Sequence, residues 1–413
     1  MVVHSVEFVV DAPLTAQVLL WALAGALLGS ISGLIPGLHA NNFALLLAGV
    51  APSVPGPPLL IGVAMLSAGV VHTFVNAIPA MALGVPDAEM AVTALPGHRL
   101  VLEGRGYEAI RLSALGSLLA VLLAVPLALP VTWAVTAAYP TIRSNLPLVL
   151  ALVVVGLVAS EYTWRARLAG LVSFALAASL GSLALDISPD APLEAGGMLA
   201  PIFAGLFGAP VLIDAIRGGG VPPQGDDAIR LPRALVGATA LAGALAGAIV
   251  GYIPGISAAI AAVAVLLLVP GGSGDRGYIV ATSGVDTANT IFALFALAAI
   301  GQPRTGVMVA FENANAPLNL PVLVVGVVLA GVLGFVLVIV VGDAYLEIVG
   351  RVSYWRISAA VLCLLFVLSY LFTGPVGLVV FLVAAAIGMV PVRFRARRVH
   401  LMGVLIGPLM IGF

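Results

Sequence analysis

Three polar side chains follow a helix-breaking motif inside a long uncharged stretch of this sequence. The stretch covers residues 12–86 and has no Asp, Glu, Lys or Arg in 75 residues. The motif is Gly33-Leu34-Ile35-Pro36-Gly37-Leu38, and His39, Asn41 and Asn42 come after it. Such a break frees backbone groups that hydrocarbon cannot satisfy, so it is tolerated where it lines a polar site. A helix restarting there would direct its first N–H groups and its positive dipole end at the site, which suits a carboxylate.

The same break recurs in the second half of the sequence, where Ser257 is the polar side chain that follows it. The matched residues, at a spacing of 218, are Gly29, Gly33, Pro36 and Gly37 with Gly247, Gly251, Pro254 and Gly255. At a spacing of 217, His72-Thr73-Phe74 corresponds to Asn289-Thr290-Ile291, and Gly84-Val85-Pro86 to Gly301-Gln302-Pro303. Corresponding breaks in two halves indicate a transporter with a substrate site near the bilayer midplane. Taken alone, Gly and Pro could instead only kink packed membrane helices.

We therefore predict that the two breaks and the aligned downstream segments bind one anionic substrate. The candidate residues are Pro36, Gly37, His39, Asn41, Asn42, Thr73, Pro254, Gly255, Ser257, Asn289, Thr290 and Arg304. Arg304 is included because a guanidinium can bind a carboxylate through two hydrogen bonds. The simpler alternative for Arg304 is that it extends from a loop toward the membrane surface.

His72 and Asp286 are the ionisable residues that we expect to couple transport to an ion. A charge within a membrane segment is functional by default. Asp286 could ligate Na⁺ or carry a proton, and His72 could relay a proton because histidine titrates near neutral pH. Unwound carbonyls near Gly33 and Gly251 could complete a Na⁺ site with Asp286. The alternatives are that Asp286, close to Arg276 in sequence, lies at the interface and that His72 only packs between helices.

The composition indicates an integral membrane protein. Hydrophobic residues make up 62% of the chain and charged residues 8%, and the mean hydropathy is +1.20. Further charge-free windows are 112–142, 144–160, 168–185, 234–274, 313–342 and 357–392. Since a spanning helix needs ~20 apolar residues, we predict an all-α polytopic protein of roughly ten to twelve membrane segments, some broken or re-entrant, in the plasma or inner membrane.

The repeat divides the chain into three parts. We predict a first transmembrane repeat at residues 1–216, a polar linker at 217–232 and a second repeat at 233–413. The linker contains three consecutive glycines, Pro222-Pro223 and Asp226-Asp227, which is typical of an exposed connector. We expect the two halves to be inverted relative to one another, the commoner arrangement in such transporters.

The basic residues exclude one class of mechanism and predict an orientation. All 17 are Arg, and a Walker A phosphate loop needs a Lys, so any driving force must be an ion gradient or another subunit. Loops rich in Arg are candidate cytoplasmic loops, provided that some apolar runs between them are hairpins. The clusters are Arg99, Arg105 and Arg111; Arg165 and Arg167; Arg217, Arg230 and Arg233; Arg351 and Arg356; and Arg393, Arg395, Arg397 and Arg398.

Several segments spread over nearly the whole chain carry a further signal. They are residues 33–38, His72-Thr73-Phe74-Val75-Asn76-Ala77-Ile78-Pro79, residues 97–116, Gly251-Tyr252-Ile253-Pro254-Gly255, Thr287-Ala288-Asn289-Thr290, Gly301-Gln302-Pro303 and residues 401–409. Together they resemble the large membrane subunit of the tripartite tricarboxylate transporters, the TctA family. The resemblance implies secondary uptake of a di- or tricarboxylate such as citrate, driven by Na⁺ or H⁺ through alternating access, with a small membrane subunit and an extracytoplasmic binding protein. It also adds Asn76 to the candidate substrate-binding residues.

Two other functional classes remain as alternatives. An anion channel is one, because broken-helix repeats can also line a pore. An intramembrane hydrolase is less well supported, since the sequence has no His-Glu-x-x-His motif and neither Asp87 nor Asp286 lies in a Gly-x-Gly-Asp context. We therefore expect no enzymatic activity, no cofactor beyond the coupling ion and no nucleic-acid partner. The expected partners are the carboxylate, the lipid bilayer, the two accessory subunits and a second copy in a homodimer.

Overall fold

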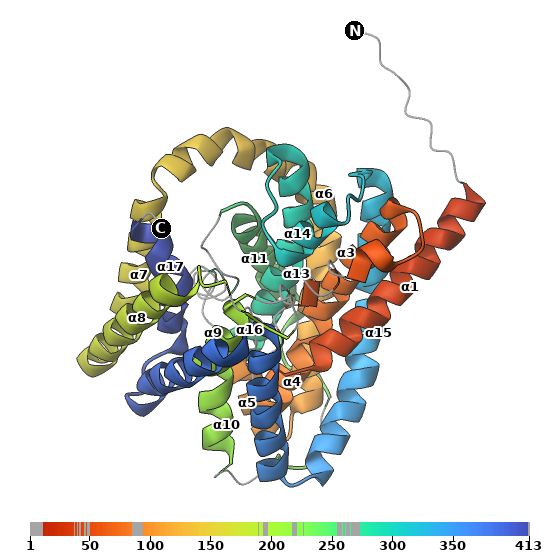
Figure 1. Cartoon of the computed structure of the whole chain (residues 1–413). Helices are drawn as coiled ribbons and strands as arrows, with labels where there is room; N and C mark the ends of the chain where they lie inside the picture. The colour runs from red at the N-terminus through yellow and green to blue at the C-terminus, as the bar shows by residue number, and fades with distance from the viewer. Residues whose placement is uncertain are drawn as a thin grey trace.

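The computed structural model describes residues 11–36, 38, 40, 43–44, 47, 50–84, 94–188, 190–192, 197–216, 221–225, 227–253, 258, 261, 265 and 273–411. Its regular elements are all helical in that part of the chain, which confirms the predicted all-α class (Figure 1). This follows from composition, because within lipid only a helix or a closed barrel satisfies its own backbone.

The helices cover most of the described residues. They are α1 (Ala12–Leu34), η1 (Ala51–Ser53), α3 (Pro58–Val75), α4 (Ala77–Leu83), α5 (Ala94–Leu102), α6 (Gly106–Ser144), α7 (Leu146–Ala159), α8 (Trp164–Ala184), α9 (Leu199–Phe203), the π-helical η2 (Ala204–Gly208), α10 (Ala209–Ala215), α11 (Arg233–Tyr252), α13 (Gly274–Ile300), α14 (Gly306–Asn313), α15 (Leu320–Arg351), α16 (Tyr354–Arg393), η3 (Arg398–Met402) and α17 (Gly403–Ile411).

Eight helices of the described chain are long and apolar enough to cross a membrane, and three shorter apolar helices accompany them. The eight are α1, α3 with α4, α6, α8, α11, α13, α15 and α16. The shorter ones cover Leu146–Ala159, Leu199–Asp214 and Arg398–Ile411. These elements make the chain a multi-pass membrane protein, as the sequence predicted.

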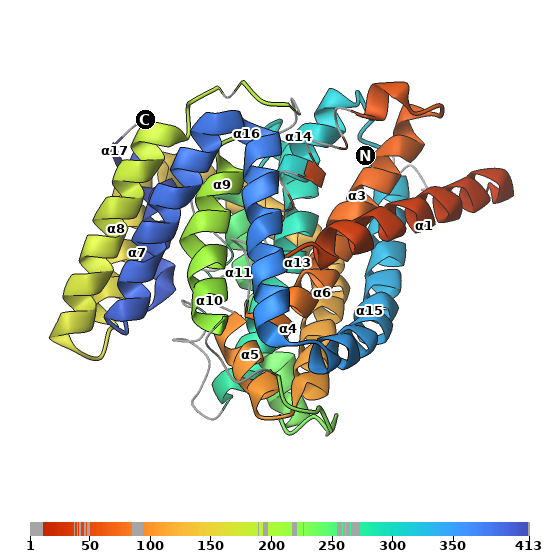
Figure 2. The ribbon, with the colours of Figure 1, turned by 60° about the horizontal axis from the view of Figure 1, so that its bottom comes forward.

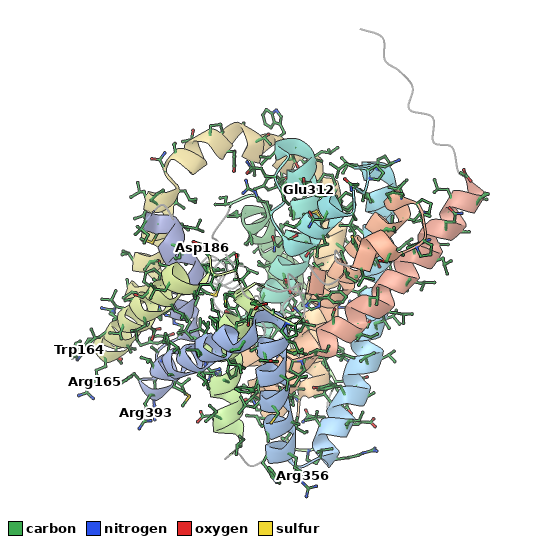
Figure 3. The ribbon with its side chains drawn as sticks, in the orientation of Figure 1. Trp164, Arg165, Asp186, Glu312, Arg356 and Arg393 are labelled. Atoms are coloured by element: carbon green, nitrogen blue, oxygen red, sulfur yellow. The ribbon has the colours of Figure 1, made fainter. Side chains whose placement is uncertain are left out.

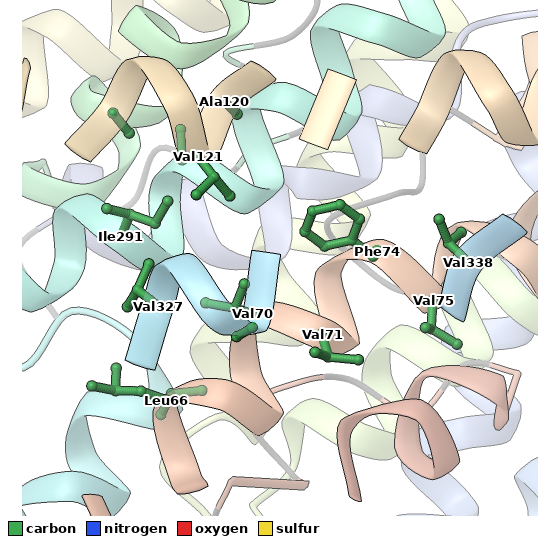
Figure 4. Close-up of a cluster of buried hydrophobic side chains, with 14 of the residues drawn as sticks. Leu66, Val70, Val71, Phe74, Val75, Ala120, Val121, Ile291, Val327 and Val338 are labelled. Atoms are coloured by element: carbon green, nitrogen blue, oxygen red, sulfur yellow. The ribbon is translucent and has the colours of Figure 1, made fainter. Parts of the chain in front are cut away.

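Helices α3 and α13 form the centre of the larger helix cluster. In the most apolar stretch of each spanning helix, 78% of the residues are buried in α3 with α4 and 83% in α13, against 33% in α1 and in α15. Helix α3 packs against α1 and α15, while α13 packs against α11 and α6, and α6 also contacts α15. Figure 4 shows where these neighbours meet: Phe74 and Val70 of α3 lie near Val121 of α6, Ile291 of α13 and Val327 of α15.

The packing of α1 on α3 is repeated by α11 on α13. A Cβ atom built on Gly25 would lie 2.2 Å from the carbonyl oxygen of Ala64, and one on Gly243 would lie 2.5 Å from that of Ala281. The glycines are 218 residues apart and the alanines 217, the spacings found in the sequence. No side chain fits at either glycine, so both helix pairs are in direct backbone contact.

Corresponding helices of the two halves also contact one another, and they do so in antiparallel directions. On α6 and α15, Gly106 faces Leu346, Ile110 faces Gly342 and Val121 faces Gly331, so residue numbers rise along one helix as they fall along the other. On α3 and α13, Thr73 meets Thr287 and Asn76 meets Asp286 in the same sense. The centre of the molecule is therefore built from two antiparallel pairs of counterpart helices.

Two hydrophobic cores each combine helices from both halves of the chain. One core unites α1, α3, α6, α11, α13 and α15, and a second unites α7, α8, α9 and η2 with α16 and α17. Each core thus takes helices from both halves. Helix α6 connects the two cores, curving over the top of the molecule in Figure 1 along a stretch that contains Pro126, Pro130 and Pro140. Proline removes a backbone hydrogen bond and bends a helix, which explains the curve.

Helix α16 reverses direction within a single apolar run. Gly374 has φ 60° and ψ −159°, and a Cβ atom there would lie 2.3 Å from the carbonyl oxygen of Asp190. Only glycine adopts this backbone conformation readily. Gly374 therefore forms the kink between two arms of α16, which Figure 2 shows meeting at an angle. The predicted charge-free window at 357–392 is therefore two segments.

Helix hairpins bring the arginine-rich loops to one end of the molecule. In the view of Figure 3, Arg165 lies at the lower left, Arg393 below it and Arg356 at the bottom, while Glu312 lies toward the top. Arg99 pairs with Asp275 at 2.8 Å, which places the start of α13 at the same end as α5. We call this the arginine-rich end, and the positive-inside rule predicts that it faces the cytoplasm.

We expect Gly243→Ala to destabilise the protein by about 1–3 kcal/mol, because its methyl group would press on backbone that cannot move aside. Gly237→Ala on the same helix is the matched control: Gly237 is exposed and has no atom within 4 Å of a built Cβ. That control should leave stability unchanged or raise it by up to ~1 kcal/mol through helix propensity. Thermal unfolding in detergent measures both, and equal melting temperatures for Gly243→Ala and the parent would contradict the contact.

We expect stability to fall as pH drops below 6.5, partly because of His98. Burial lowers the pKa of His98 from 6.5, although a hydrogen bond to the Met81 carbonyl opposes the shift, and Arg398 adds to it. The neutral ring is favoured in the folded protein, so this stability is present above pH 6.5 and is lost as pH falls toward the lower folded-state pKa. Melting temperatures measured across this range should depend less on pH in His98→Asn; an identical dependence would contradict the assignment.

Candidate functional site

Four buried polar side chains meet where α3 crosses α13, and we call them the crossing cluster: Thr73, Asn76, Asp286 and Thr287. The hydroxyl oxygens of Thr73 and Thr287 are 3.0 Å apart, and Asn76 Nδ2 donates to Asp286 Oδ2 at 3.1 Å. Thr73 donates its hydroxyl proton to the Val70 carbonyl at 2.7 Å, so Thr287 is the donor between the two threonines. Each of these four residues is at most 5% exposed.

The two helices place this cluster far from either membrane surface. Asp286 lies close to the midpoint of α13, which runs from Gly274 to Ile300 and rises ~1.5 Å per residue, so each end of the helix is roughly 20 Å away. Asn76 sits at the junction of α3 and α4, where its backbone N–H donates to the His72 carbonyl at 2.9 Å. A fully buried Asp286 at this depth is not an interfacial residue.

His72 lies one position before Thr73 and points to α1. Its Nδ1 is 2.8 Å from Ser32 Oγ, and its ring stacks on Phe43 with centroids 6.3 Å apart. Ser32 donates its own proton to the Gly29 carbonyl at 3.0 Å. We therefore assign the proton of this contact to His72 Nδ1, so that Nε2 is the acceptor nitrogen whenever the ring carries a single proton.

A second group of buried hydroxyls joins α13 to α6 one turn from Asp286. It consists of Ser283 of α13 with Ser113 and Ser117 of α6, and the sequence analysis did not predict the two serines of α6. Ser283 Oγ is 2.8 Å from Ser113 Oγ, and Ser117 donates to the Ser283 carbonyl at 3.2 Å. Nearby, a Cβ atom on Gly116 would lie 2.3 Å from the Val280 carbonyl, so α6 and α13 touch through backbone. The spacing of small residues on α6 was the available signal, since such faces mark close helix crossings in membranes.

The structure places several other predicted residues beside the cluster. Asn289 and Thr290, the counterparts of His72 and Thr73, are 5% and 6% exposed on α13. Gly33 packs on α3 so that a Cβ atom would lie 3.0 Å from the Asn76 nitrogen. Gly251 packs on α13, where a Cβ atom would lie 3.3 Å from the Asn289 carbonyl oxygen. The ends of α1 and α11 thus lie next to buried polar residues of α3 and α13.

Part of the predicted site lies outside the described residues. Pro36 is described, and it is buried in the turn that follows α1. Gly37, His39, Asn41, Asn42, Pro254, Gly255 and Ser257 fall outside, and their roles stay predictions.

Arg304 is not brought together with the crossing cluster. It follows α13, so roughly 20 Å of helix separates it from Asp286. Its guanidinium lies 5.5 Å from the ring centroid of Tyr139 on α6 and donates to the Tyr139 hydroxyl. Its contact with a substrate carboxylate stays a prediction, and the structure places it at the end opposite the arginine-rich end.

The crossing cluster offers oxygen atoms for ion binding. Asp286 supplies a carboxylate, Asn76 an amide, and Thr73 and Thr287 supply hydroxyls, which are the ligand types that hard cations prefer. Among the described residues, no group of three or more His, Cys, Asp or Glu could hold a transition metal. This arrangement is suited to binding a small cation or exchanging a proton.

We expect the Thr73–Thr287 contact to appear as coupling in a double-mutant cycle. Thr73→Val and Thr287→Val each remove one hydroxyl at nearly constant volume, and the double variant should be more stable than the sum of the single losses by about 0.6 kcal/mol. SDS-induced unfolding in detergent gives the free energy of unfolding of the parent, the two single variants and the double variant. Thr73→Val combined with Ser179→Ala, an exposed serine of α8, is the additive control; additivity in the first cycle would contradict the contact.

Comparison with known proteins agrees with this architecture. The family model described as "Tripartite tricarboxylate transporter TctA family" matches residues 19–403. The uncharacterized protein MJ1079 of Methanocaldococcus jannaschii is 29% identical over 408 residues, which cover 96% of this chain and 98% of that protein. No solved structure matches the chain.

Proposed function

Because the chain belongs to the tripartite tricarboxylate transporter TctA family, we propose that it is a secondary active transporter for di- or tricarboxylates such as citrate. The family is one of transporters and not of enzymes, and its model covers nearly the whole chain. The observation that carries the proposal is the crossing cluster, a buried carboxylate with hydroxyl and amide neighbours in the middle of a membrane-spanning helix. Such a group is functional by default in lipid.

The substrate is proposed to bind where α1 and α11 break. The last described residues of both helices lie against α3 and α13, with Gly33 beside Asn76 and Gly251 beside Asn289. Half-helices restarting from these points would aim N–H groups and positive dipole ends at the crossing cluster. Asn289 and Thr290 on one side, and Thr73 and Asn76 on the other, would then complete two unlike half-sites for one carboxylate.

Alternating access is proposed to depend on an inverted relation between the halves. Two observations support the inversion: α6 runs antiparallel to its counterpart α15, and α3 runs antiparallel to its counterpart α13. A two-fold axis perpendicular to the helices relates such pairs, and in a spanning protein that axis lies in the membrane plane. The two halves can then exchange conformations to open the site to either side.

The coupling ion is proposed to bind at Asp286. Na⁺ is favoured because the cluster around Asp286 supplies oxygen atoms from Thr73, Thr287 and Asn76. A proton carried by Asp286, with His72 as relay, is the second candidate, and it is favoured by the acceptor nitrogen that the Ser32 contact assigns to His72.

The family also suggests partners. TctA proteins work with the small TctB and TctC subunits. We propose that this chain does the same, with a small membrane subunit and an extracytoplasmic binding protein as its partners. A homodimer stays a prediction.

We expect proteoliposomes that contain the chain to show saturable citrate uptake that follows one imposed gradient, Na⁺ or H⁺. Asp286→Asn should abolish the dependence on that gradient, because it removes the charge that binds the ion. Glu312→Gln is the control, since Glu312 lies on α14 away from the crossing cluster. Labelled citrate and smaller dicarboxylates are tested separately, with and without the two partner subunits.

The outcomes separate the candidate classes. No uptake of any carboxylate, even with both partners, would contradict the proposed substrate. Single-channel current would favour an anion channel. Gradient dependence that survives in Asp286→Asn would leave Asp286 with a structural role only.

A further inference from the structure

A network of ion pairs ties the two halves together at the arginine-rich end. Its centre is Glu108, near the start of α6, which is fully buried. Glu108 accepts hydrogen bonds from Arg276 of α13 at 2.8 and 3.1 Å, from Arg105 at 2.7 Å and from the backbone N–H of Arg230 at 2.8 Å. Both carboxylate oxygens therefore accept from Arg276 of the second half, and Oε2 also accepts from Arg105 of the first.

A second pair lies one turn further along α6. Arg111 donates to the two carboxylate oxygens of Asp343, on α15, at 2.9 and 3.0 Å. Asp227 of the linker lies 3.4 Å from the same guanidinium. Bidentate arginine–carboxylate contacts are both strong and specific in geometry. The start of α6 is thus fastened to α13 through Glu108 and to α15 through Arg111.

The linker is fastened over this end as well. The Gly106 N–H donates to Gln224 Oε1 at 2.6 Å, and Gln224 Nε2 donates to the Val101 carbonyl at 3.0 Å. The Gly225 N–H donates to the Gly104 carbonyl at 3.1 Å. The sequence predicted an exposed connector; most of its described residues are exposed, and it also bonds to the turn between α5 and α6.

At the opposite end, the first residues of α3 and α15 carry no charged side chain. Helix α3 begins with Pro58-Leu59 where its counterpart α13 begins with Gly274-Asp275-Arg276. Helix α15 begins with Leu320-Pro321-Val322 where its counterpart α6 begins with Gly106-Tyr107-Glu108. There α15 meets α3 with Gly326 packed against the Val63 side chain.

Packing at that opposite end is also looser. A largely apolar groove of about 680 Å³ opens between α1, α6, α13 and α15, and its walls include Val18, Val125, Leu129 and Val322 together with Asp11. At the arginine-rich end, by contrast, α6 and α15 are in close contact, with Gly342 against Ile110 and Gly106 against Leu346. One end of the interface between the halves is therefore tight and held by ion pairs, and the other has a largely apolar groove and the Arg304–Tyr139 contact.

We propose that the Glu108–Arg276 and Arg111–Asp343 pairs are the gate on the arginine-rich side, closed in this conformation. The proposal rests on the proposed transport function, because alternating access requires each end of the interface to open in turn. Ion pairs suit this role: while the end is closed they are strong, and when it opens the separated charges are solvated by water. Identical ends would give no preference between the two states, so the charges bias the molecule toward closure on this side.

Accessibility of a buried cysteine behind the gate tests the proposal. Ser283 is fully buried against Ser113, two turns along α13 from Arg276. In a Cys363→Ser background, which removes the single native cysteine, Ser283→Cys would be labelled by a membrane-impermeant maleimide applied from the arginine-rich side. Adding Asp343→Asn should raise the labelling rate by about fivefold, the effect of losing one partly exposed charge-assisted contact. Glu108→Gln should raise it at least as much.

The control and the rescue separate a gate from a structural brace. Glu347→Gln removes a carboxylate at the same end whose pair with Arg351 lies within α15 and on the surface, and labelling should not change. Arg111→Asp combined with Asp343→Arg restores the pair in reversed order and should return labelling toward the parent rate. Asp343 is partly exposed, so the test stands even where Glu108→Gln fails to fold.

The results have one meaning each. Raised labelling in Asp343→Asn with reversal in the exchanged pair supports the gate. Parent-like labelling in a folded Asp343→Asn protein, or an equal rise in Glu347→Gln, overturns it. The labelling needs no substrate, so absence of carboxylate uptake would contradict the proposed function without deciding the gate.

Discussion

The direct backbone contact of α1 with α3, and of α11 with α13, is the interaction on which the rest of the structure depends. Gly25 and Gly243 make it by leaving no side chain between the helices. Because the helices touch, the ends of α1 and α11 lie against Asn76 and Asn289 and not against lipid. Polar groups at a helix break are stable in a membrane only when protein surrounds them. The close contact therefore permits a polar site at this depth.

The sequence predicted this arrangement where the signal was periodic or compositional. Uncharged stretches indicated membrane helices, and the common spacing of the Pro-Gly motifs indicated a repeated unit, whose glycine contacts the structure shows in both halves. The resemblance of scattered motifs to the TctA family is confirmed by the family match over residues 19–403. These predictions succeeded because residue types and their spacing along the chain carry these features, without knowledge of which helices touch.

Features that depend on contacts between distant segments were harder to predict. Glu108 belongs to a sequence that reads as a charged loop, and its burial arises from Arg276 and Arg230, more than a hundred residues away. Ser113 and Ser117 gave no distinct signal on a long apolar helix. Gly374 looked like an ordinary membrane glycine, and its positive φ was not visible in the sequence. Arg304 had the right chemistry for a carboxylate but lies at the wrong depth for the crossing cluster.

The two halves form a near-symmetric scaffold, but its two ends differ in their ion pairs and its two proposed half-sites differ in their side chains. The central claim is that the crossing cluster binds the coupling ion. Equilibrium binding of radioactive Na⁺ to the purified protein, compared with Asp286→Asn, tests this most directly. The account predicts saturable binding to the parent protein and none to the folded variant. Equal binding to both proteins, or no binding to the parent at any Na⁺ concentration, would contradict a Na⁺ site at the α3–α13 crossing.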